Sequence, residues 1–304
     1  MWCQSSDGSD FVLTGQQPIP VVIDGCLNNR RELCRKFELS ANTGAADVMC
    51  RMLSEMSLPG VLNLLNGSFS GICMDESRGE FYLFRDHLGQ KSLFYALTAD
   101  GNCYFSNRLD YLISMPGVDL SIDLEALGNY FALGYIASPR TIYCGIRKVM
   151  AGYFVRISRT ADLISRRYWQ PNFIPKRNIS FSEAIEETRG NLERAIGRCL
   201  DNYSDASFML SGGVDSAVAA SLLKNEYEVI GVTLQMQGGC FALKDIDKSL
   251  GMRLFVLCFF AIDLSFIFDA VYCAVKSVEK TDPKERVGVF CRKNKKVGVI
   301  TNLN

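Results

Sequence analysis

The sequence is poor in the residues that several enzyme classes require. It contains one histidine, His87, so a Ser-His-Asp triad would have to use this residue. His87 lies in the turn-like stretch RDHLGQK, and no GxSxG motif is nearby, which argues against serine hydrolase chemistry. The 12 cysteines include no CxxC pair, and most have apolar neighbours. Reduced core thiols are therefore expected rather than a zinc site or a disulfide framework.

The chain also lacks an excess of charge of either sign. Its 33 Lys and Arg residues balance 33 Asp and Glu residues, so the broad positive field of nucleic-acid-binding proteins is absent and no nucleic acid partner is expected. The first residues show no basic and apolar signal pattern, which favours a cytoplasmic protein. The apolar run at residues 254–275 is interrupted by Asp263 and Asp269. We expect a buried strand at 254–260 followed by a buried helix, and no membrane span.

The first half of the sequence has the pattern of strands and hairpins with helices between them. Strands are predicted at 20–23, 69–74 and 81–84, and helices at 46–56 and 121–131. Gly79, between the second and third strands, is a hairpin signal. Asp24 and Gly25 are expected to end the first strand.

A domain boundary is expected at residues 168–177, where two prolines and a basic pair break the pattern. The predicted domains are residues 1–170 and 178–304. Ser180 and Glu183 form a capping-box signature that opens an amphipathic helix. Strands and helices then alternate, at 206–210, 214–224, 229–234, 243–250 and 254–260. This alternation predicts a parallel sheet with helices on it, so the fold class is α+β followed by α/β.

The segment FMLSGGVDS stands between the first strand and the first helix of that alternation. Gly212 and Gly213 allow a sharp turn in which consecutive N–H groups reach a phosphate, and the following helix adds its positive end. The hydroxyls of Ser211 and Ser216 can donate to phosphate oxygens, and Asp215 suits a Mg²⁺ ion that bridges them. The spacing is not that of a Walker A loop. A phosphate cradle is predicted; the alternative is a turn that only caps the helix.

Two further segments narrow the interpretation. SGGVDS resembles the PP-loop of the ATP pyrophosphatases, which adenylate a substrate by cleaving ATP between its α and β phosphates. LNGSFSGICMDESRGEFYLFRDHLGQKSLFYA resembles the glutaminase domain of the asparagine synthetases, and FALGYIASPRTIYCGIRKVMAGYFVRI resembles their interdomain segment. The resemblance covers about residues 15–301, and the order of its parts is that of class II glutamine-dependent synthetases.

The resemblance implies a fold, ligands and site residues. The fold would be an N-terminal αββα sandwich of the Ntn-hydrolase type, followed by a Rossmann-like parallel sheet with helices, similar to the adenine nucleotide α-hydrolases. The cofactors would be ATP and Mg²⁺, and the substrates aspartate or a similar carboxylate with glutamine or ammonia. Asp215 would be the catalytic and metal-binding residue. The nucleotide-binding residues would be Leu210, Ser211, Gly212, Gly213, Asp215, Ser216 and Val232.

The sequence departs from this family at the glutamine site. The family's nucleophile is a cysteine at residue one, whereas Cys3 follows two residues here. The family's aspartate for the glutamine amine aligns with Ala45. The family's Asn-Gly-Glu loop is replaced by Asp24, Gly25 and Cys26, a degenerate glutamine-binding set. Asp24 removes an amide donor from the oxyanion site, a loss of roughly 3 kcal/mol in comparable enzymes, so glutamine hydrolysis is expected to be absent.

Three interpretations follow for function. The first is an asparagine synthetase-like carbon–nitrogen ligase of asparagine biosynthesis, with glutamine as amido donor by family resemblance. The second is a catalytically inactive, nucleotide-binding remnant or regulatory subunit that forms a homodimer or pairs with a full-length synthetase, because the family's second, acidic nucleotide loop has no counterpart before residue 304 and the domain looks truncated. The third is a PP-loop enzyme of the tRNA-thiolation type, disfavoured by the glutaminase-like half and the neutral charge balance.

Overall fold

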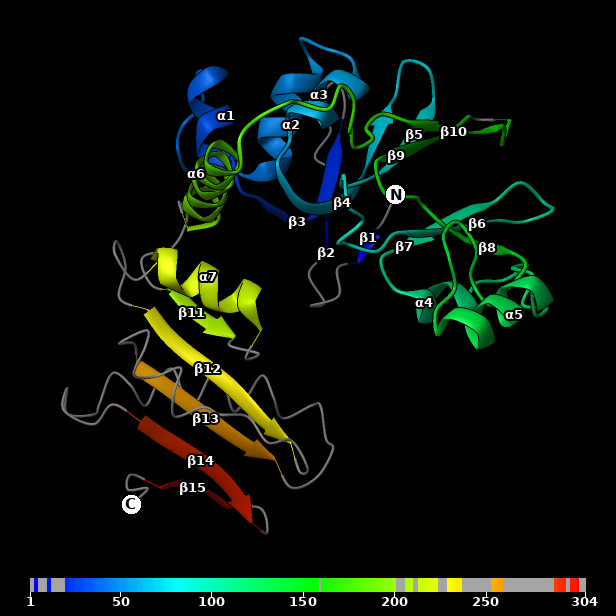
Figure 1. Cartoon of the computed structure of the whole chain (residues 1–304). Coiled ribbons are helices and arrows are strands. Elements are labelled where there is room, and N and C mark those ends of the chain that lie inside the picture. Colours follow the sequence, from blue (N-terminus) through cyan, green and yellow to red (C-terminus); the bar gives the residue numbers. More distant parts are fainter. Residues whose placement is uncertain are drawn as a thin grey trace. The chain divides into compact units, whose positions relative to one another are not determined.

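The computed structural model describes residues 3–4, 10–11, 20–158, 160–200, 206–209, 213–223, 229–236, 253–259, 287–293 and 296–300. The chain divides into two units, Met1–Arg177 and Asn178–Asn304 (Figure 1). Each unit has a five-stranded sheet of its own and its own helices.

A five-stranded antiparallel sheet forms the centre of the first unit. Its strands lie in the order β10 (Leu163–Arg167), β9 (Tyr153–Ile157), β5 (Glu80–Arg85), β4 (Gly67–Asp75) and β3 (Val21–Leu27). β4 and β5 form the predicted hairpin, and Gly79 has a φ of 62° in its turn. The predicted end of the first strand at Asp24 is wrong, because β3 pairs with β4 as far as Leu27. Gly25 has a φ of 122°, which glycine adopts without a steric penalty, so the strand continues through it.

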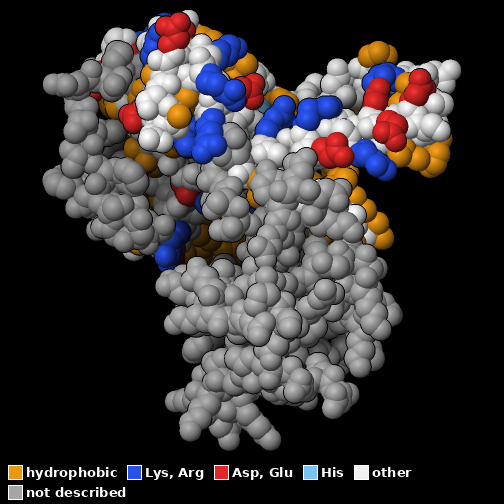
Figure 2. Space-filling model, turned by 90° about the vertical axis from the view of Figure 1, so that its left-hand side faces the viewer, with side chains coloured by type: hydrophobic (Ala, Val, Ile, Leu, Met, Phe, Trp, Pro, Cys, Tyr) orange, Lys and Arg blue, Asp and Glu red, His pale blue; other side chains and the backbone are white. Residues whose placement is uncertain are grey.

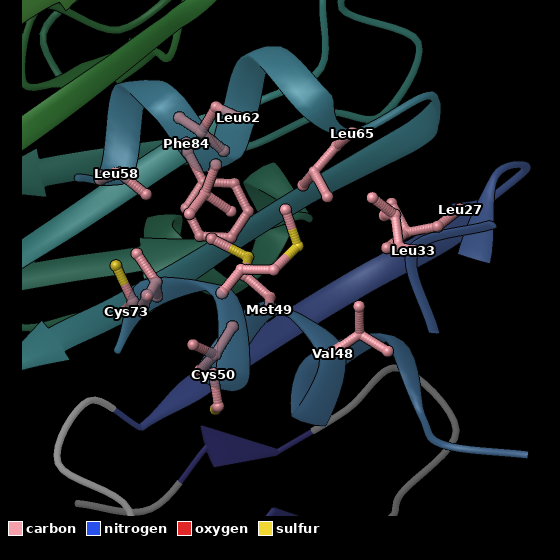
Figure 3. Packing of buried hydrophobic residues seen from close by; sticks show 14 of the residues in the cluster. Leu27, Leu33, Val48, Met49, Cys50, Leu58, Leu62, Leu65, Cys73 and Phe84 are labelled. Atoms are coloured by element: carbon pink, nitrogen blue, oxygen red, sulfur yellow. The ribbon is translucent and has the colours of Figure 1, made fainter. Parts of the chain in front are cut away.

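Three helices cover one face of this sheet. They are α1 (Arg30–Lys36), α2 (Ala45–Leu53) and α3 (Leu58–Leu64). In α2, Val48, Met49 and Met52 are fully buried, as the helical spacing of apolar residues predicted. Figure 3 shows Met49 and Leu62 beside Phe84 of the sheet, in the core where the helices meet the strands. The sequence pattern does not predict α1 and α3, which have seven residues each.

A smaller antiparallel sheet packs on the other face of the large one. Its strands lie in the order β7 (Cys103–Ser106), β6 (Phe94–Leu97) and β8 (Ile146–Lys148). Leu93 and Tyr95 share a buried cluster with Leu83 and Val155 of the large sheet. Behind the small sheet, α4 (Leu109–Ile113) buries Leu112. The unit also contains α5 (Leu124–Leu133) and the pair β1 (Cys3–Gln4) and β2 (Asp10–Phe11). The mixed class with antiparallel sheets is confirmed.

The second unit contains a mostly parallel sheet. Its strands lie in sequence order: β11 (Ala206–Met209), β12 (Val229–Met236), β13 (Arg253–Phe259), β14 (Val287–Lys293) and β15 (Lys296–Ile300). The first four are parallel and β15 is antiparallel to β14. The predicted strands at 206–210, 229–234 and 254–260 are therefore confirmed to within two residues at each end. The predicted helices at 243–250 and after residue 260 lie outside the described residues.

Two helices of the second unit are described, α6 (Phe181–Leu200) and α7 (Val214–Leu223). The capping box of α6 is confirmed: the Glu183 backbone N–H donates to Ser180 Oγ (3.2 Å), and the Ser180 N–H donates to Glu183 Oε2 (2.8 Å). No residue of α6 is buried, and its apolar positions Ile185 and Leu192 are 43% and 39% exposed. The apolar residues of this helix therefore have the predicted spacing, but they remain partly exposed and do not form part of a buried core.

The surface and the cysteines agree with the composition. Figure 2 shows Lys and Arg side chains interspersed with Asp and Glu on the face that it draws. Cys34, Cys50 and Cys73 are buried, and burial raises the pKa of Cys73 to about 12, which makes its thiolate inaccessible at neutral pH. Within the part of the chain that the structure describes, no helix is long and apolar enough to cross a membrane.

Candidate functional site

The predicted glutamine loop lies on the edge strand β3 of the large sheet. Gly25 and Cys26 are exposed, and Asp24 is half-buried between them and the start of the strand. Asp24 Oδ1 accepts from Lys91 Nζ (3.2 Å), and Asp24 Oδ2 accepts from the side-chain amide of Asn107 (3.0 Å). Both carboxylate oxygens therefore have partners, and the negative charge is paired with a lysine.

Lys91 is placed by the RDHLGQK turn, whose centre is Asp86. This aspartate is fully buried, and its carboxylate accepts four backbone N–H groups. The donors belong to Phe69 (3.3 Å), Leu88 (3.1 Å), Gln90 (3.0 Å) and Lys91 (3.0 Å). The last donor is the backbone of Lys91 itself. The turn therefore fixes the position of the Lys91 backbone, from which the side chain reaches Asp24.

Arg85 stabilises the same turn from the other side. Its guanidinium donates to the carbonyls of Gly89 and Lys91, and to that of Val149 at 2.8 Å. Burial lowers the pKa of Arg85. The charge-assisted hydrogen bonds to the carbonyls offset the free-energy cost of burying the guanidinium charge. Gly89 has a φ of 67°, and a Cβ there would lie 3.0 Å from Arg85 Cζ. Arg85 and Asp86 are thus the internal supports of the turn, not a pair on the surface.

An asparagine links the end of β3 to the start of β4. Asn29 is buried; its side chain donates to the Leu64 carbonyl (2.9 Å) and accepts from the Asn66 backbone N–H (2.9 Å). Cys26 Sγ donates to the side-chain oxygen of Asn28 (3.3 Å). Ala45 is the first residue of α2 and offers no polar side-chain atom. The position that the resemblance assigns to amine binding therefore has no side-chain group for that role.

The predicted phosphate loop of the second unit is described in part. Leu210, Ser211 and Gly212 lie outside the described residues. Gly213 is exposed and directly precedes α7, and the Ser216 hydroxyl donates to its carbonyl (3.0 Å). The described part thus has the strand before the motif and the helix that begins within it, as predicted.

Two further predicted nucleotide residues lie next to this loop. Asp215 is exposed in the first turn of α7, so its carboxylate is accessible to a cation. Val232 of β12 pairs with Met209, the last residue of β11, so its backbone lies beside the start of the loop. Within the described residues, no group of three or more His, Cys, Asp or Glu side chains could hold a metal ion.

These two sites can be compared with known proteins. A family described as the glutamine amidotransferase domain matches residues 5–169, more than half of the 304 residues. The chain belongs to this family. A second family, described as the tRNA methyl transferase HUP domain, matches residues 206–251 of this chain. The second match includes β11, α7 and β12, the elements that surround the phosphate loop.

Curated relatives of this chain are named asparagine synthetases. A putative asparagine synthetase [glutamine-hydrolyzing] of Mycobacterium tuberculosis is 31% identical over 194 residues, covering 61% of this chain and 29% of that protein. The asparagine synthetase [glutamine-hydrolyzing] of Rattus norvegicus is 26% identical over 272 residues, covering 79% of this chain and 44% of that protein. The chain therefore spans less than half the length of these relatives.

A solved structure of the B. subtilis glutamine phosphoribosylpyrophosphate amidotransferase, complexed with ADP and GMP, has a TM-score of 0.35 and 11% identity to this chain. The matched region covers 85% of this chain and 63% of the amidotransferase chain. This likeness carries neither fold nor function across to this chain.

The sequence pattern indicates Asp24 but not the side chains that contact it. Lys91 is 67 residues and Asn107 is 83 residues away along the chain, and only the pairing of β3 and the position of the turn bring them together. Lys91 stood in the motif that resembles the glutaminase domain, which was the one available signal. No local pattern around Asn107 indicates its contact with Asp24.

Proposed function

We propose that this chain is an asparagine synthetase-like, ATP-dependent amide ligase in architecture, acting in the cytoplasm in asparagine biosynthesis. The observation that supports this is the order of parts: an amidotransferase domain is followed by a unit in which SGGVDS comes after β11 and continues into the first turn of α7. The first unit would be of the Ntn-hydrolase type, and the second a Rossmann-like sheet of the adenine nucleotide α-hydrolase kind.

The nucleotide residues have distinct roles in this proposal. The backbone N–H groups of residues 210–213 and the hydroxyls of Ser211 and Ser216 would hold phosphate oxygens of ATP. Asp215 would hold a Mg²⁺ ion, for which its exposed position at the start of α7 is suited, and the ion would offset the negative charge of the phosphates. Val232, beside the end of β11, would contact the adenine.

The reaction would be the adenylation of a carboxylate, aspartate or a similar acid. An oxygen of that carboxylate attacks the α phosphorus of ATP, and pyrophosphate leaves. Ammonia then attacks the acyl carbon, so that an amide forms and AMP leaves. The loop would contribute by stabilising the charge on the leaving pyrophosphate.

A second candidate is a catalytically silent subunit that binds nucleotide, as a homodimer or together with a full-length synthetase. The contacts of Asp24 favour it, because both of its oxygens are already bonded and it carries a negative charge where the family has an amide. Glutamine would then not be hydrolysed by this chain, and free ammonia would be the nitrogen donor of any ligation.

A third candidate is a PP-loop enzyme that acts on tRNA. The match of residues 206–251 to a domain named after a tRNA methyl transferase favours it. The balanced charge and the amidotransferase domain oppose it. Retention of tRNA by the purified chain at physiological salt would support this candidate over the other two.

The nucleotide site is tested by Asp215→Ala. We expect isothermal titration to detect Mg-ATP binding to the unaltered chain and no binding to Asp215→Ala, because the cation that joins the phosphates to the protein would lose its ligand. Glu193→Ala, on α6 of the same unit, is the matched control and should bind as the unaltered chain does. Equal affinity of the Asp215 variant and the unaltered chain would reject the site.

Ligase and silent subunit are separated by product formation. The chain is incubated with Mg-ATP, aspartate and ammonium, and pyrophosphate release is measured. Release that depends on aspartate and disappears in Asp215→Ala supports the ligase. Mg-ATP binding without pyrophosphate release supports the silent subunit.

A further inference from the structure

The only histidine of the chain lies inside a group of aromatic rings. The centre of the His87 ring is 4.9 Å from that of Trp169, 5.6 Å from that of Tyr168 and 6.5 Å from that of Phe69. Two of these rings come from the segment after β10, far along the chain from His87. The imidazole is therefore a contact between the RDHLGQK turn and the end of the first unit.

One nitrogen of this imidazole has no hydrogen-bond partner. His87 Nε2 is buried, and it is the one buried side-chain nitrogen or oxygen without a partner in the described part of the chain. A buried polar atom of this kind costs free energy, and adding a proton to it would cost more, because an N–H donor and a charge would both lack a partner.

The segment at Tyr168 and Trp169 is tied to the same turn by further bonds. The Tyr168 hydroxyl donates to the Arg85 carbonyl (2.7 Å), and the backbone N–H groups of Tyr168 and Trp169 donate to the Gly152 carbonyl (2.9 and 3.2 Å). The Gly152 N–H donates to the Asp86 carbonyl (2.9 Å). Gly152 has a φ of 70°, and a Cβ there would lie 2.6 Å from the Trp169 carbonyl oxygen. The turn is thus hydrogen-bonded to the residues that directly precede residues 170–177.

Few charged groups near His87 could stabilise the positive charge of its protonated imidazole. Asp86 attracts it, but its oxygens already accept four backbone N–H groups and cannot turn to the imidazole without opening the turn. The neighbouring Arg85 is a cation bonded to carbonyls. Burial raises the pKa of Tyr168, which stays neutral, and the backbone of Leu62 acts to raise the pKa of His87.

The balance of these effects sets the direction of the pH dependence. Burial, the largest effect, lowers the pKa of His87 below its ordinary value of 6.5, and Asp86 and the Leu62 backbone oppose it. The unfolded or released state then binds a proton more readily than the closed state. The closed state therefore has its full stability above pH 6.5 and loses part of it as the pH falls from 6.5 towards the lowered pKa.

We propose that His87, Tyr168 and Trp169 form an acid-sensitive latch that holds the end of the first unit against the RDHLGQK turn. Protonation of His87 places an unpartnered N–H between the rings, and the 168–169 segment leaves the turn. The latch couples pH to the attachment of the chain that leads into the second unit. It does not depend on the proposed ligase activity.

Two spectroscopic readouts test the latch on the full chain. With Trp2→Phe, Trp169 is the only tryptophan, and its emission reports whether its ring is packed or in water. We expect the emission to shift to longer wavelength as the pH falls through about 6.5 to about 5, reversibly and without loss of the far-ultraviolet circular dichroism of the folded chain. The proton resonances of the single imidazole give its pKa directly, which should lie below 6.5.

His87→Phe in the same background is the matched control, since it keeps a ring between Trp169 and Phe69 and cannot titrate. The emission shift should disappear in this variant. A shift of equal size in His87→Phe, a measured His87 pKa at or above 6.5, or loss of the circular dichroism over the same pH range would each overturn the proposal. The imidazole titration of the unaltered chain decides the question if His87→Phe does not fold.

Discussion

Asp86 shows how a motif residue can be functional in appearance and structural in role. It stands in the stretch that resembles the glutaminase domain, yet its fully buried carboxylate contacts only the backbone of its own turn and of Phe69. Each of its oxygens accepts two N–H groups. Its contribution to the site is indirect, because the turn that it holds carries Lys91.

Asp86→Asn is expected to destabilise the first unit. The amide would turn an NH₂ group towards backbone N–H donors, so that at least one pair of donors would face each other in a buried place. We expect a loss of about 2–4 kcal/mol in the free energy of unfolding, measured by urea denaturation. Glu55→Gln, a control on the exposed Arg51–Glu55 pair, should leave the midpoint nearly unchanged. Equal midpoints for both variants would contradict this role.

Asp24 is the residue at which sequence and structure give different information. The sequence indicates that an amide donor has become a carboxylate. The structure adds that this carboxylate is paired with Lys91 and Asn107, so the substitution is accommodated in the fold. The side chains of Lys91 and Asp24 are 39% and 41% exposed, so solvent screens this ion pair. We therefore expect the pair to fix the positions of the two side chains more than to stabilise the unit.

At the scale of elements, β3 depends on one glycine. Gly25 pairs with Phe69 of β4 at a φ of 122°, and a Cβ at this position would lie 2.0 Å from the Ser68 carbonyl oxygen. No side chain can relieve this contact, because it is with the backbone of the neighbouring strand. The Asp-Gly pair, usually a turn signal, is here part of a continuous edge strand.

Gly25→Ala should therefore break the pairing of β3 with β4. We expect destabilisation on the order of 3 kcal/mol or more, seen as a lower urea midpoint. Gly101→Ala is the matched control: Gly101 also has a positive φ, 83°, but a Cβ there meets nothing within 4 Å. The control should cost only the strain of the positive φ. A Gly25 variant no less stable than the Gly101 variant would contradict the argument.

Elements with strong local signals were predicted well. The capping box of α6, the apolar spacing of α2 and the glycine turn between β4 and β5 involve residues within a few positions of one another. α1 and α3 were missed, because seven residues make about two turns, too few for a helical period to stand out. Their stability comes from packing on the sheet.

At the scale of the whole molecule, the two units combine different states of two sites. In the second unit, β11 and α7 lie on either side of the predicted phosphate loop, whereas in the first unit we expect the glutamine site to be degenerate. Arg85 and Asp86 hold the turn of the first unit by hydrogen bonds to its backbone. Asp24 and Ala45 offer neither the amide donor nor the amine ligand that the resemblance to the asparagine synthetases would require.

The full chain should release no glutamate from glutamine. We expect Asp24 to repel a developing oxyanion and Ala45 to offer no ligand for an amine, so restoring one of them is expected to be insufficient. We expect the same result for Asp24→Asn, which supplies an amide donor alone. A coupled glutamate assay measures both. Glutamate formation by the purified, unaltered chain would show that another nucleophile operates.

The sequence by itself indicated an α+β part followed by an α/β part, and it predicted six of the described strands, four of the described helices, and the motif that follows β11 and enters α7. These depend on residues close together in the chain, whose period and turn chemistry can be read directly. Only the tertiary structure decided that Asp24 contacts Lys91 and Asn107, and that His87 contacts Trp169. These contacts depend on strand order and on which turn faces which strand, and alternating apolar patterns leave both open, since they specify a face of the sheet and not a neighbour.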